Sequence, residues 1–341
     1  MTRTPLAVAA AASAALLLAG CVAGEDARPA SAGTAAAQSG GELSIDFATY
    51  NPLSLVIKEK GWLEDALADD GVEVSWIQSA GSNKANELLR SGELDVGSTA
   101  GSAALLARSN GSPIRTIDIY SQPEWAALVT TPDSGIDSVD DLRGKQVAAT
   151  KGTDPYFFLV QSLEEAGVDP SEVTIQNLQH ADGRAALESG AVDAWAGLDP
   201  IMAAAEQAGN VLFYRNVDFN TYGFLNATES FLQEQPEVAQ TVVDAYEHAR
   251  AWAQENPEET AAILADVAGI DPAVAAAVIE RTTLDVDPVP GRAQHDVLSA
   301  VGPIFVETGD VADQAQIDEA LSSLFDDSYA KKADPDAIGA A

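Results

Sequence analysis

The sequence predicts an α/β protein built from two lobes, each a mainly parallel sheet flanked by helices. Strand-like and helix-like segments alternate over most of the chain, as in parallel sheets with crossover helices. The length of 341 residues fits about two domains of ~150 residues each. Residues 89–104, LRSGELDVGSTAGSAA, are matched by residues 187–202, LESGAVDAWAGLDPIM, so each half carries one copy of a repeat.

The repeat describes a helix end, a turn, a short buried strand and a new helix start. Its matched positions are Leu89 with Leu187, Ser91 with Ser189, Gly92 with Gly190, and Asp95 with Asp193. The glycine suits the left-handed residue that ends a helix. Either copy alone is also typical of an ordinary connection from a helix to a strand. The pair favours two lobes of like construction that direct strand ends and helix N-termini at a shared cleft.

In the first half, apolar alternation and turn residues separate the elements. We expect strands at 43–48, 72–78, 94–97 and 114–120, and helices at 53–67, interrupted near 58–62, and at 83–90. Ser82 is the expected N-cap of the last helix, and Gly101-Ser102 gives a turn and an N-cap after the third strand. Residues 126–131 form a strand that crosses to the second lobe.

In the second half, we expect a helical turn at 138–142, strands at 145–150, 173–178, 192–195 and 211–214, and helices from Asp154 to 166 and at 181–188. Asp154-Pro155 and Asp199-Pro200 each supply a natural N-cap followed by a proline at the first helical position. Residues 222–225 cross back to the first lobe. The rest is Ala-rich and helical, at 239–255, 258–267, 272–282, 294–308 and 314–325.

The N-terminus has the pattern of an export signal. Arg3 precedes an Ala/Leu-rich stretch, residues 6–18, that is short for a membrane-spanning helix. Small residues then precede Cys21, the only cysteine, and together they resemble a bacterial lipobox. The resemblance implies a lipoprotein signal peptide at 1–20 and lipidation of Cys21; a plain signal peptide cut elsewhere is the alternative. Residues 21–41, rich in Ala, Ser and Gly, predict a flexible tether.

The composition excludes several classes of function. The formal net charge of −35 argues against nucleic-acid binding, which needs clustered Lys and Arg, and against electrostatic docking on anionic lipid. His180, His248 and His295 are scattered, so neither a metal site nor a cofactor is expected. No G-x-S-x-G elbow, P-loop or G-x-G-x-x-G motif is present, so we do not expect an enzyme.

Ligands of such sheets bind beyond the carboxyl ends of the strands. The expected helix starts after Ser82, Ser102, Thr153 and Asp199 lie there, and helix N-termini bind anions without Lys or Arg. If Asp154 and Asp199 cap their own helices, however, they take the amides that an anion needs. A cleft-facing Asp199 would instead bind an ammonium or a ring N–H, which favours a zwitterion or a neutral heterocycle.

Three stretches carry a family resemblance: Lys151-Gly152-Thr153, residues 192–195 (VDAW) with Asp199-Pro200, and residues 249–257 (ARAWAQENP). The chain resembles the solute-binding lipoproteins of ABC importers, in the branch that binds aliphatic sulfonates, taurine and nitrate, with thiamine-pyrimidine binders as relatives. This implies a hinged periplasmic-binding-protein-like fold of type II. Lobe one would be residues 42–130 plus 225–327, lobe two residues 131–224, and residues 328–341 a frayed tail.

The resemblance also implies a role and a site. The protein would capture an aliphatic sulfonate outside the cytoplasm, anchored to the membrane through Cys21, and deliver it to permease and ATPase subunits. Taurine, nitrate, a thiamine-type pyrimidine, or a surface interaction lipoprotein without a small ligand are the alternatives. The family's usual aromatics are replaced by Leu198 and Ile201, and T-G-D-A-P-P by residues 99–104, TAGSAA. The expected ligand-binding residues are Tyr50, Asn51, Gly81, Ser82, Gly101, Ser102, Gln122, Thr153, Asp154, Tyr156, Trp195 and Asp199.

Overall fold

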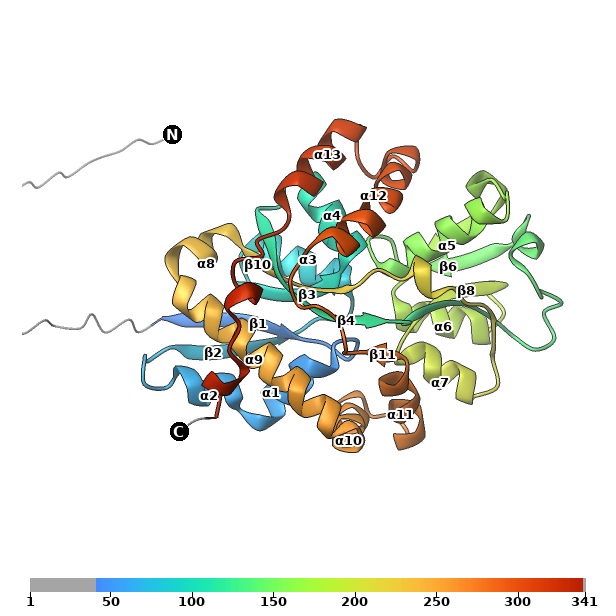
Figure 1. Cartoon of the computed structure of the whole chain (residues 1–341). Coiled ribbons are helices and arrows are strands. Elements are labelled where there is room, and N and C mark those ends of the chain that lie inside the picture. The colour runs from blue at the N-terminus through green and yellow to red at the C-terminus, as the bar shows by residue number, and fades with distance from the viewer. Residues whose placement is uncertain (1–40, 340–341) are drawn as a thin grey trace, which may run out of the picture. The chain divides into compact units, whose positions relative to one another are not determined.

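The computed structural model describes residues 41–339, which contain two separate β-sheets (Figure 1). The first sheet has the order β11-β4-β10-β3-β1-β2, and the second the order β7-β6-β8-β5-β9. The strands of the first are β1 (Glu42–Phe47), β2 (Glu73–Gln78), β3 (Val96–Ala100), β4 (Ile114–Pro123), β10 (Gly223–Thr228) and β11 (Thr282–Thr283). Those of the second are β5 (Ala126–Thr130), β6 (Gln146–Ala149), β7 (Thr174–Asn177), β8 (Ala194–Leu198) and β9 (Val211–Tyr214).

The two-sheet α/β architecture is confirmed, but the expectation of mainly parallel sheets is wrong. β1 pairs in parallel with β2 and β3, and β6 with β7 and β8. Every antiparallel pair involves β4, β5 or β10. These strands flank the two points where the chain passes from one sheet to the other. The antiparallel pairing is therefore confined to the strands next to the crossings.

The crossings also bear on the expected domain boundaries. We call the first sheet with the helices that pack on it lobe one, and the second sheet with its helices lobe two. β5 lies within residues 42–130, the range expected for lobe one, yet it pairs with β8 and β9 of lobe two. The first crossing therefore lies between Pro123 and Ala126, and the second between β9 and β10.

Helices cover both faces of the first sheet. Lobe one begins with α1 (Pro52–Lys60), α2 (Trp62–Leu67), α3 (Ser82–Ser91) and α4 (Gly101–Ser109). Gly61, with a left-handed φ of 68°, separates α1 from α2, as the interrupted pattern predicts. All five residues of β3 are buried, which is typical of a strand covered on both faces.

The second sheet is built the same way. Its helices are α5 (Asp154–Glu165), α6 (His180–Glu188) and α7 (Ile201–Gln207), with short 3-10 turns η1 (Val139–Leu142), η2 (Pro170–Glu172) and η3 (Val217–Phe219). All five residues of β8 are buried. Helix α5 packs on β5, β6 and β8 and also contacts α4 and α12 of lobe one, so the two lobes touch through α5.

The C-terminal part is helical, as expected, and returns to lobe one. It comprises α8 (Glu229–Glu234), α9 (Pro236–Glu255), α10 (Pro257–Ala268), α11 (Pro272–Glu280), α12 (Arg292–Glu307) and α13 (Gln314–Ser323), then η4 (Ala330–Lys332) and η5 (Pro335–Ala337). In Figure 1, α9 and α1 lie on one side of the first sheet, and α4, α12 and α13 on the other.

The expectation of a frayed tail is wrong for its described part, residues 328–339. The tail packs on α9: the Asp334 N–H donates to Asp244 Oδ1 at 2.9 Å, and His248 Nδ1 lies 2.8 Å from the Pro335 carbonyl oxygen. Ile338 is buried. The polar sequence of the tail does not predict this contact, because its hydrogen-bond partners, Asp244 and His248, lie on α9.

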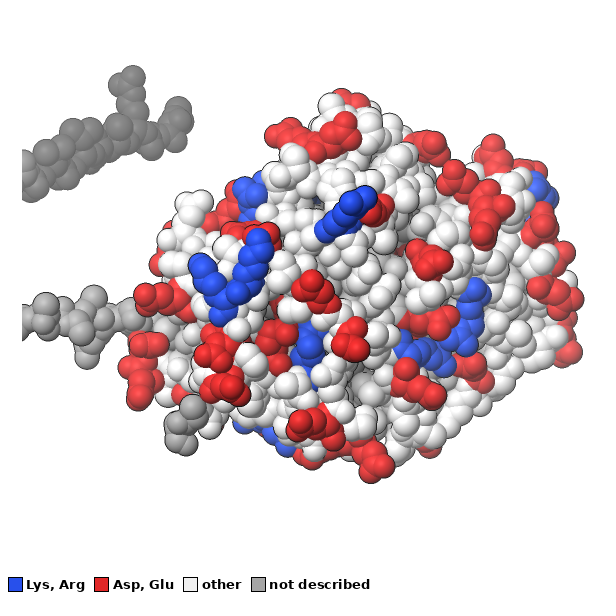
Figure 2. Space-filling view, in the orientation of Figure 1, with Lys and Arg blue, Asp and Glu red and all other residues white. Residues whose placement is uncertain are grey.

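Acidic side chains are scattered over the face seen in Figure 2 rather than gathered in one patch. Among residues 41–339, no helix combines the length and apolar character needed to cross a bilayer. The expected signal peptide, the expected lipidation site at Cys21 and most of the expected tether fall outside these residues.

Candidate functional site

The two copies of the repeat have matching structural roles. Gly92 and Gly190 have left-handed backbones, with φ of 76° and 73°. Asp95 Oδ2 accepts from the Ser44 N–H of β1 at 2.9 Å, and Asp193 Oδ2 accepts from the Gln146 N–H of β6 at 2.8 Å. Each aspartate thus fixes its own strand beside a parallel neighbour. The helix starts that follow β3 and β8 are placed at corresponding strand ends.

The N-terminus of α4, which follows the first copy, is already occupied by protein groups. The Gly101 N–H donates to the Tyr222 carbonyl oxygen at 2.9 Å, and the Ser102 N–H to Thr221 Oγ1 at 3.1 Å. Ser102 Oγ donates to Asp154 Oδ1 at 2.6 Å. Ser102 is a residue of the helix and not its N-cap, which is Ala100. The expected anion site at Ser102 is therefore filled by the second crossing segment and by lobe two.

Asp154 is the carboxylate that fills it. It accepts four hydrogen bonds, from Ser102 Oγ, from Trp125 Nε1 at 2.7 Å, and from the N–H and Oγ1 of Thr221 at 2.8 and 2.7 Å. Burial raises the pKa of Asp154, while these donors oppose the rise. The expected N-cap role is wrong: Thr153 is the N-cap of α5, and the Asp154 side chain turns to lobe one and to both crossing segments.

The N-terminus of α3 is different. Gly81, not Ser82, is its N-cap, and its carbonyl oxygen accepts from the N–H groups of Lys84 and Ala85. Ser82 Oγ accepts from the Ala100 N–H at 2.9 Å. In the described part of the chain, no acceptor lies in hydrogen-bonding position to the N–H groups of Ser82 and Asn83. This helix start presents two unpaired donors.

The start of α5 lies beside it. The N–H groups of Thr153 and Asp154 likewise have no acceptor within residues 41–339. Gly152 has a left-handed φ of 76°, and a Cβ there would lie 3.7 Å from Asn83 Cβ of lobe one. Thr153 Oγ1 donates to the Thr150 carbonyl oxygen at 2.6 Å, so its hydroxyl proton is engaged. Two helix starts with unpaired donors, one from each lobe, thus adjoin.

A histidine of lobe two, His180, lies beside the start of α3. His180, the first residue of α6, is 2% exposed, and a Cβ on Gly81 would lie 3.0 Å from its Nε2. His180 Nε2 and Asn83 Oδ1 are both buried without a hydrogen-bond partner among the described residues. Burial lowers the pKa of His180 to about 4, so the ring is neutral at pH 7.

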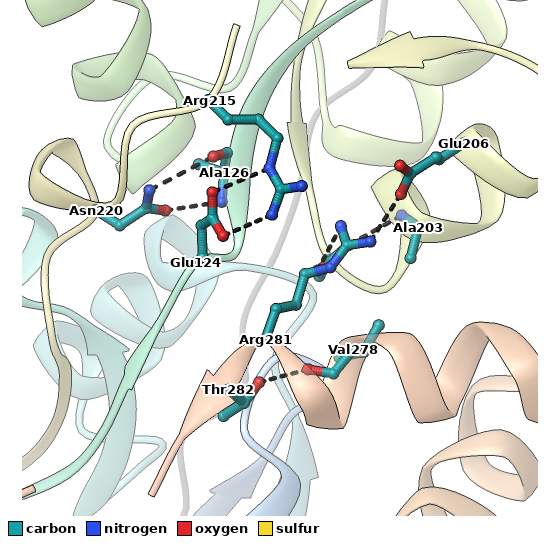
Figure 3. A network of polar contacts seen from close by, with 10 residues as sticks. Glu124, Ala126, Ala203, Glu206, Arg215, Asn220, Val278, Arg281 and Thr282 are labelled. Atoms are coloured by element: carbon teal, nitrogen blue, oxygen red, sulfur yellow. Dashed lines mark hydrogen bonds and ion pairs between the residues drawn. The ribbon is translucent and has the colours of Figure 1, made fainter. Parts of the chain in front are cut away.

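Asp199 belongs to a second contact between the lobes. The expectation that Asp199 is the N-cap of α7 is wrong, because Pro200 holds that position; Asp199 Oδ1 still accepts from the Ala203 N–H in the first turn at 2.9 Å. Its Oδ2 lies 3.5 Å from Arg281 Nη1 of lobe one. Figure 3 shows Arg281 directed toward Glu206, at 2.7 Å, and Arg215 paired with Glu124 near the first crossing. Asp199 thus already has a cation beside it, although neither Asp199 Oδ2 nor Arg281 Nη1 has a hydrogen-bond partner among the described residues.

Four further expected residues make contacts within the protein. Tyr50 OH donates to the Ser98 carbonyl oxygen at 2.9 Å, and its ring meets Trp125 edge-on at 6.0 Å. Asn51 caps α1 and donates from Nδ2 to Tyr246 OH at 3.1 Å. Gln122 is half-buried and lies on β4 opposite Thr283 of β11. Tyr156 is buried beneath the Lys151 Nζ, 5.4 Å from its ring centre.

Trp195 does not face the cleft. It is fully buried in a hydrophobic cluster with Leu187 of α6 and Met202 of α7, on the face of β8 opposite α5. A Cβ on Gly183 would lie 2.7 Å from the indole, so α6 can pack this closely only with glycine there. The expectation that Trp195 walls the ligand is wrong because strand alternation turns it away.

Sequence reasoning missed the partners that decide which helix starts are open. Thr221, Arg281 and Asn83 carried no motif, and His180 was considered only as a metal ligand. One signal in the sequence could have found some of these partners. The two expected crossing segments predict that residues near 125 and 221 meet where the two lobes join. Within residues 41–339, no three or more of His, Cys, Asp and Glu are placed to hold a metal ion.

Comparisons with known proteins agree with this architecture. A putative aliphatic sulfonates-binding protein of Bacillus subtilis is 27% identical over 69% of this chain and 71% of its own length. Another, from Escherichia coli, is 28% identical over 64% of this chain and 69% of its own. The alkanesulfonate-binding protein SsuA of Xanthomonas axonopodis pv. citri, solved bound to MOPS, superposes with a TM-score of 0.73 at 22% identity, covering 82% of this chain and 97% of that protein.

The family assignment rests on a family model. The model described as NMT1/THI5 like matches residues 52–260, which hold the described strands except β1 and β11, and the starts of α3, α4, α5 and α7. The chain belongs to the NMT1/THI5-like family.

Proposed function

We propose that this protein is an extracytoplasmic solute-binding lipoprotein that captures an aliphatic sulfonate and delivers it to an ABC importer. The observation that carries the proposal is the pair of adjoining helix starts, α3 of lobe one and α5 of lobe two, whose first N–H groups have no acceptor. The relatives whose names specify aliphatic sulfonates support the choice of ligand.

A sulfonate suits these donors chemically. It spreads one negative charge over three oxygens that only accept hydrogen bonds, and helix N-termini offer N–H groups with a partial positive charge. The site needs no Lys or Arg, which matters in a chain of net charge −35. At physiological salt, exposed charges more than roughly 8 Å away are largely screened. The nearby helix dipoles then determine whether an anion binds.

Capture would work by closure of the two lobes on the ligand. The sulfonate would accept from α3 and α5 together only when the lobes meet, so it would shift the population toward the closed state. Phe157 of α5 packs against Phe305 of α12, with ring centres 4.5 Å apart, and adds an apolar contact to this state.

The alternatives are nitrate, a thiamine-type pyrimidine, and taurine held through its ammonium by Asp199. The Arg281 cation beside Asp199 disfavours an ammonium there. A surface interaction lipoprotein without a small ligand would leave the donors of α3 and α5 without a purpose. We propose binding rather than catalysis, because the sulfonate-binding relatives are named as binding proteins.

The membrane anchor is a separate part of the proposal. Lipidation of Cys21 after removal of residues 1–20 would hold the protein at the outer side of the cytoplasmic membrane, where permease and ATPase subunits receive the ligand. Mass spectrometry of protein from membranes should find a diacylated N-terminal cysteine, and Cys21→Ala should release the protein.

Thermal unfolding of the full chain against a solute panel tests the ligand class. The panel holds alkanesulfonates of several lengths, taurine, nitrate, sulfate, a thiamine pyrimidine and unrelated amino acids. A ligand that binds only the folded state stabilises it by about 2.7 kcal/mol at 100 times its Kd. A rise in Tm with sulfonates alone supports the proposal, and no rise with any sulfonate contradicts it.

A further inference from the structure

We propose that His180 is a specificity-determining ligand contact, and that the preferred ligand is a short sulfonate with a hydroxyl or amino group two carbons from the sulfur. The inference rests on the proposed function and names its substrate more closely. The plain alkanesulfonates offer only acceptors, whereas the site at Gly81 also contains unpaired acceptors.

The tautomer of His180 follows from its neighbours. Thr150 Oγ1 donates its one proton to the Leu178 carbonyl oxygen at 2.6 Å, and it lies 3.2 Å from His180 Nδ1. Thr150 Oγ1 therefore accepts from Nδ1–H, and the neutral ring has a lone pair on Nε2. That lone pair is buried and has no donor among residues 41–339.

A second acceptor faces the same spot. Asn83 Oδ1 is also buried without a partner, and a Cβ on Gly81 would come within 3.0 Å of both it and His180 Nε2. Because Gly81 has no side chain, residue 81 places no Cβ against these two buried acceptors. An unpaired buried acceptor is costly, so a donor brought by the ligand gains more here than in water.

The spacing limits the size of the ligand. The unpaired N–H groups belong to Ser82 and Asn83 of α3, and the two acceptors, Asn83 Oδ1 of α3 and His180 Nε2 of α6, lie beside Gly81, so donors and acceptors gather around the start of α3. A molecule that uses both carries its sulfonate and its donor only a few atoms apart. Taurine and 2-hydroxyethanesulfonate meet this condition, and a longer chain with a distant donor does not.

Isothermal titration calorimetry of the full chain with ethanesulfonate, 2-hydroxyethanesulfonate and taurine tests the proposal. We expect at least one 2-substituted ligand to bind tenfold or more tighter than ethanesulfonate. In His180→Leu this preference should fall to within about twofold, while ethanesulfonate still binds. His180→Gln, which keeps an acceptor, should retain part of the preference, and the exposed His295→Leu should retain all of it.

The outcomes separate this inference from the proposed function. If ethanesulfonate binds the native protein as tightly as both 2-substituted ligands, or if His180→Leu keeps the preference, the role of His180 is wrong and the sulfonate proposal stands. If no sulfonate binds the native protein, the proposed function fails. A melting curve for each variant shows whether the buried substitution leaves the fold intact.

Discussion

The dipeptide Gly-Ser occurs at the starts of α3 and α4, as Gly81-Ser82 and Gly101-Ser102, but Gly81 is the N-cap of α3 whereas Gly101 is the first residue of α4. At α4, the two N–H groups are taken by Tyr222 and Thr221, and the serine hydroxyl by Asp154. At α3, the N–H groups of Ser82 and Asn83 are unpaired. The same dipeptide therefore occurs at one closed junction and at one open donor site, and at α4 the closing partners come from distant residues.

The difference assigns separate tasks to the two helix starts. Asp154 acts at α4 as a built-in anion, which connects lobe two to lobe one and to both crossing segments. The start of α3 keeps its donors for a ligand. A protein that binds anions through helix dipoles thus uses one of these dipoles for its own junction.

The largest expected effect is at the closed junction. Asp154→Ala would leave Ser102, Trp125 and Thr221 without their acceptor, so we expect the free energy of unfolding to fall by roughly 3 kcal/mol or more. Urea denaturation monitored by tryptophan fluorescence measures it. The exposed Asp133→Ala is the control and should change little. A loss below 1 kcal/mol would show that the junction does not depend on this carboxylate.

The next effect is at the open helix start. Asn83→Asp puts a negative charge beside the unpaired N–H groups, so we expect sulfonate affinity to fall tenfold or more with little change in Tm, because an acid suits a helix N-terminus. Ser102→Asp should instead lower Tm, because it places a second carboxylate against Asp154. Calorimetry and melting curves compare the two. Equal loss of Tm in both variants would remove the distinction between the two starts.

A smaller effect concerns pH and the Asp199–Arg281 contact. Burial raises the pKa of Asp199 to about 7, although Arg281 opposes the rise. Between pH 4 and 7 the folded state then holds a proton that the unfolded state has lost, so stability falls as pH rises through this window. Asp199→Asn should reduce the difference in unfolding free energy between pH 5 and pH 7.5 by roughly 2 kcal/mol.

Asp46 provides the internal reference for that experiment. Burial raises its pKa to about 7 as well, and it is present in both proteins, so part of the pH dependence should survive in Asp199→Asn. Urea denaturation at the two pH values decides the matter. An unchanged pH dependence would show that the Arg281 pairing keeps Asp199 charged throughout.

The smallest effect compares the two copies of the repeat. Asp95 accepts from both the N–H and the hydroxyl of Ser44, whereas Asp193 accepts from the Gln146 N–H. We expect Asp95→Asn to destabilise by about 1–2 kcal/mol and Asp193→Asn by about 1 kcal/mol or less. Denaturant midpoints measured side by side give the order, and a reversed order would contradict this view of the repeat.

Much of the fold followed from local pattern. The repeat, the strand positions and the split between α1 and α2 at Gly61 depend on apolar periodicity and on backbone that suits glycine. The sequence pattern failed to predict features that depend on contacts with residues distant in the sequence. The tail at 328–339 has few apolar residues, and its docking depends on Asp244 and His248 of α9.

The candidate site was less predictable than the fold. Gly81 and Ser82 lie where lobe one meets His180 of lobe two, but Asp154 pairs with groups of lobe one instead of capping α5, and Trp195 lies on the face of β8 opposite α5. Composition and spacing do not predict which tertiary contacts these side chains make. The unpaired state of His180 Nε2 likewise depends on Thr150 and Gly81, which are distant in sequence.

The measurement that tests the central claim most directly is a backbone amide NMR titration of the ¹⁵N-labelled full chain with 2-hydroxyethanesulfonate. Our account predicts large downfield proton shifts for the N–H groups of Ser82 and Asn83, because they gain a charged acceptor. The N–H groups of Gly101 and Ser102, already bonded within the protein, should move little. Large shifts at Gly101 and Ser102, with Ser82 and Asn83 unchanged, would contradict the account.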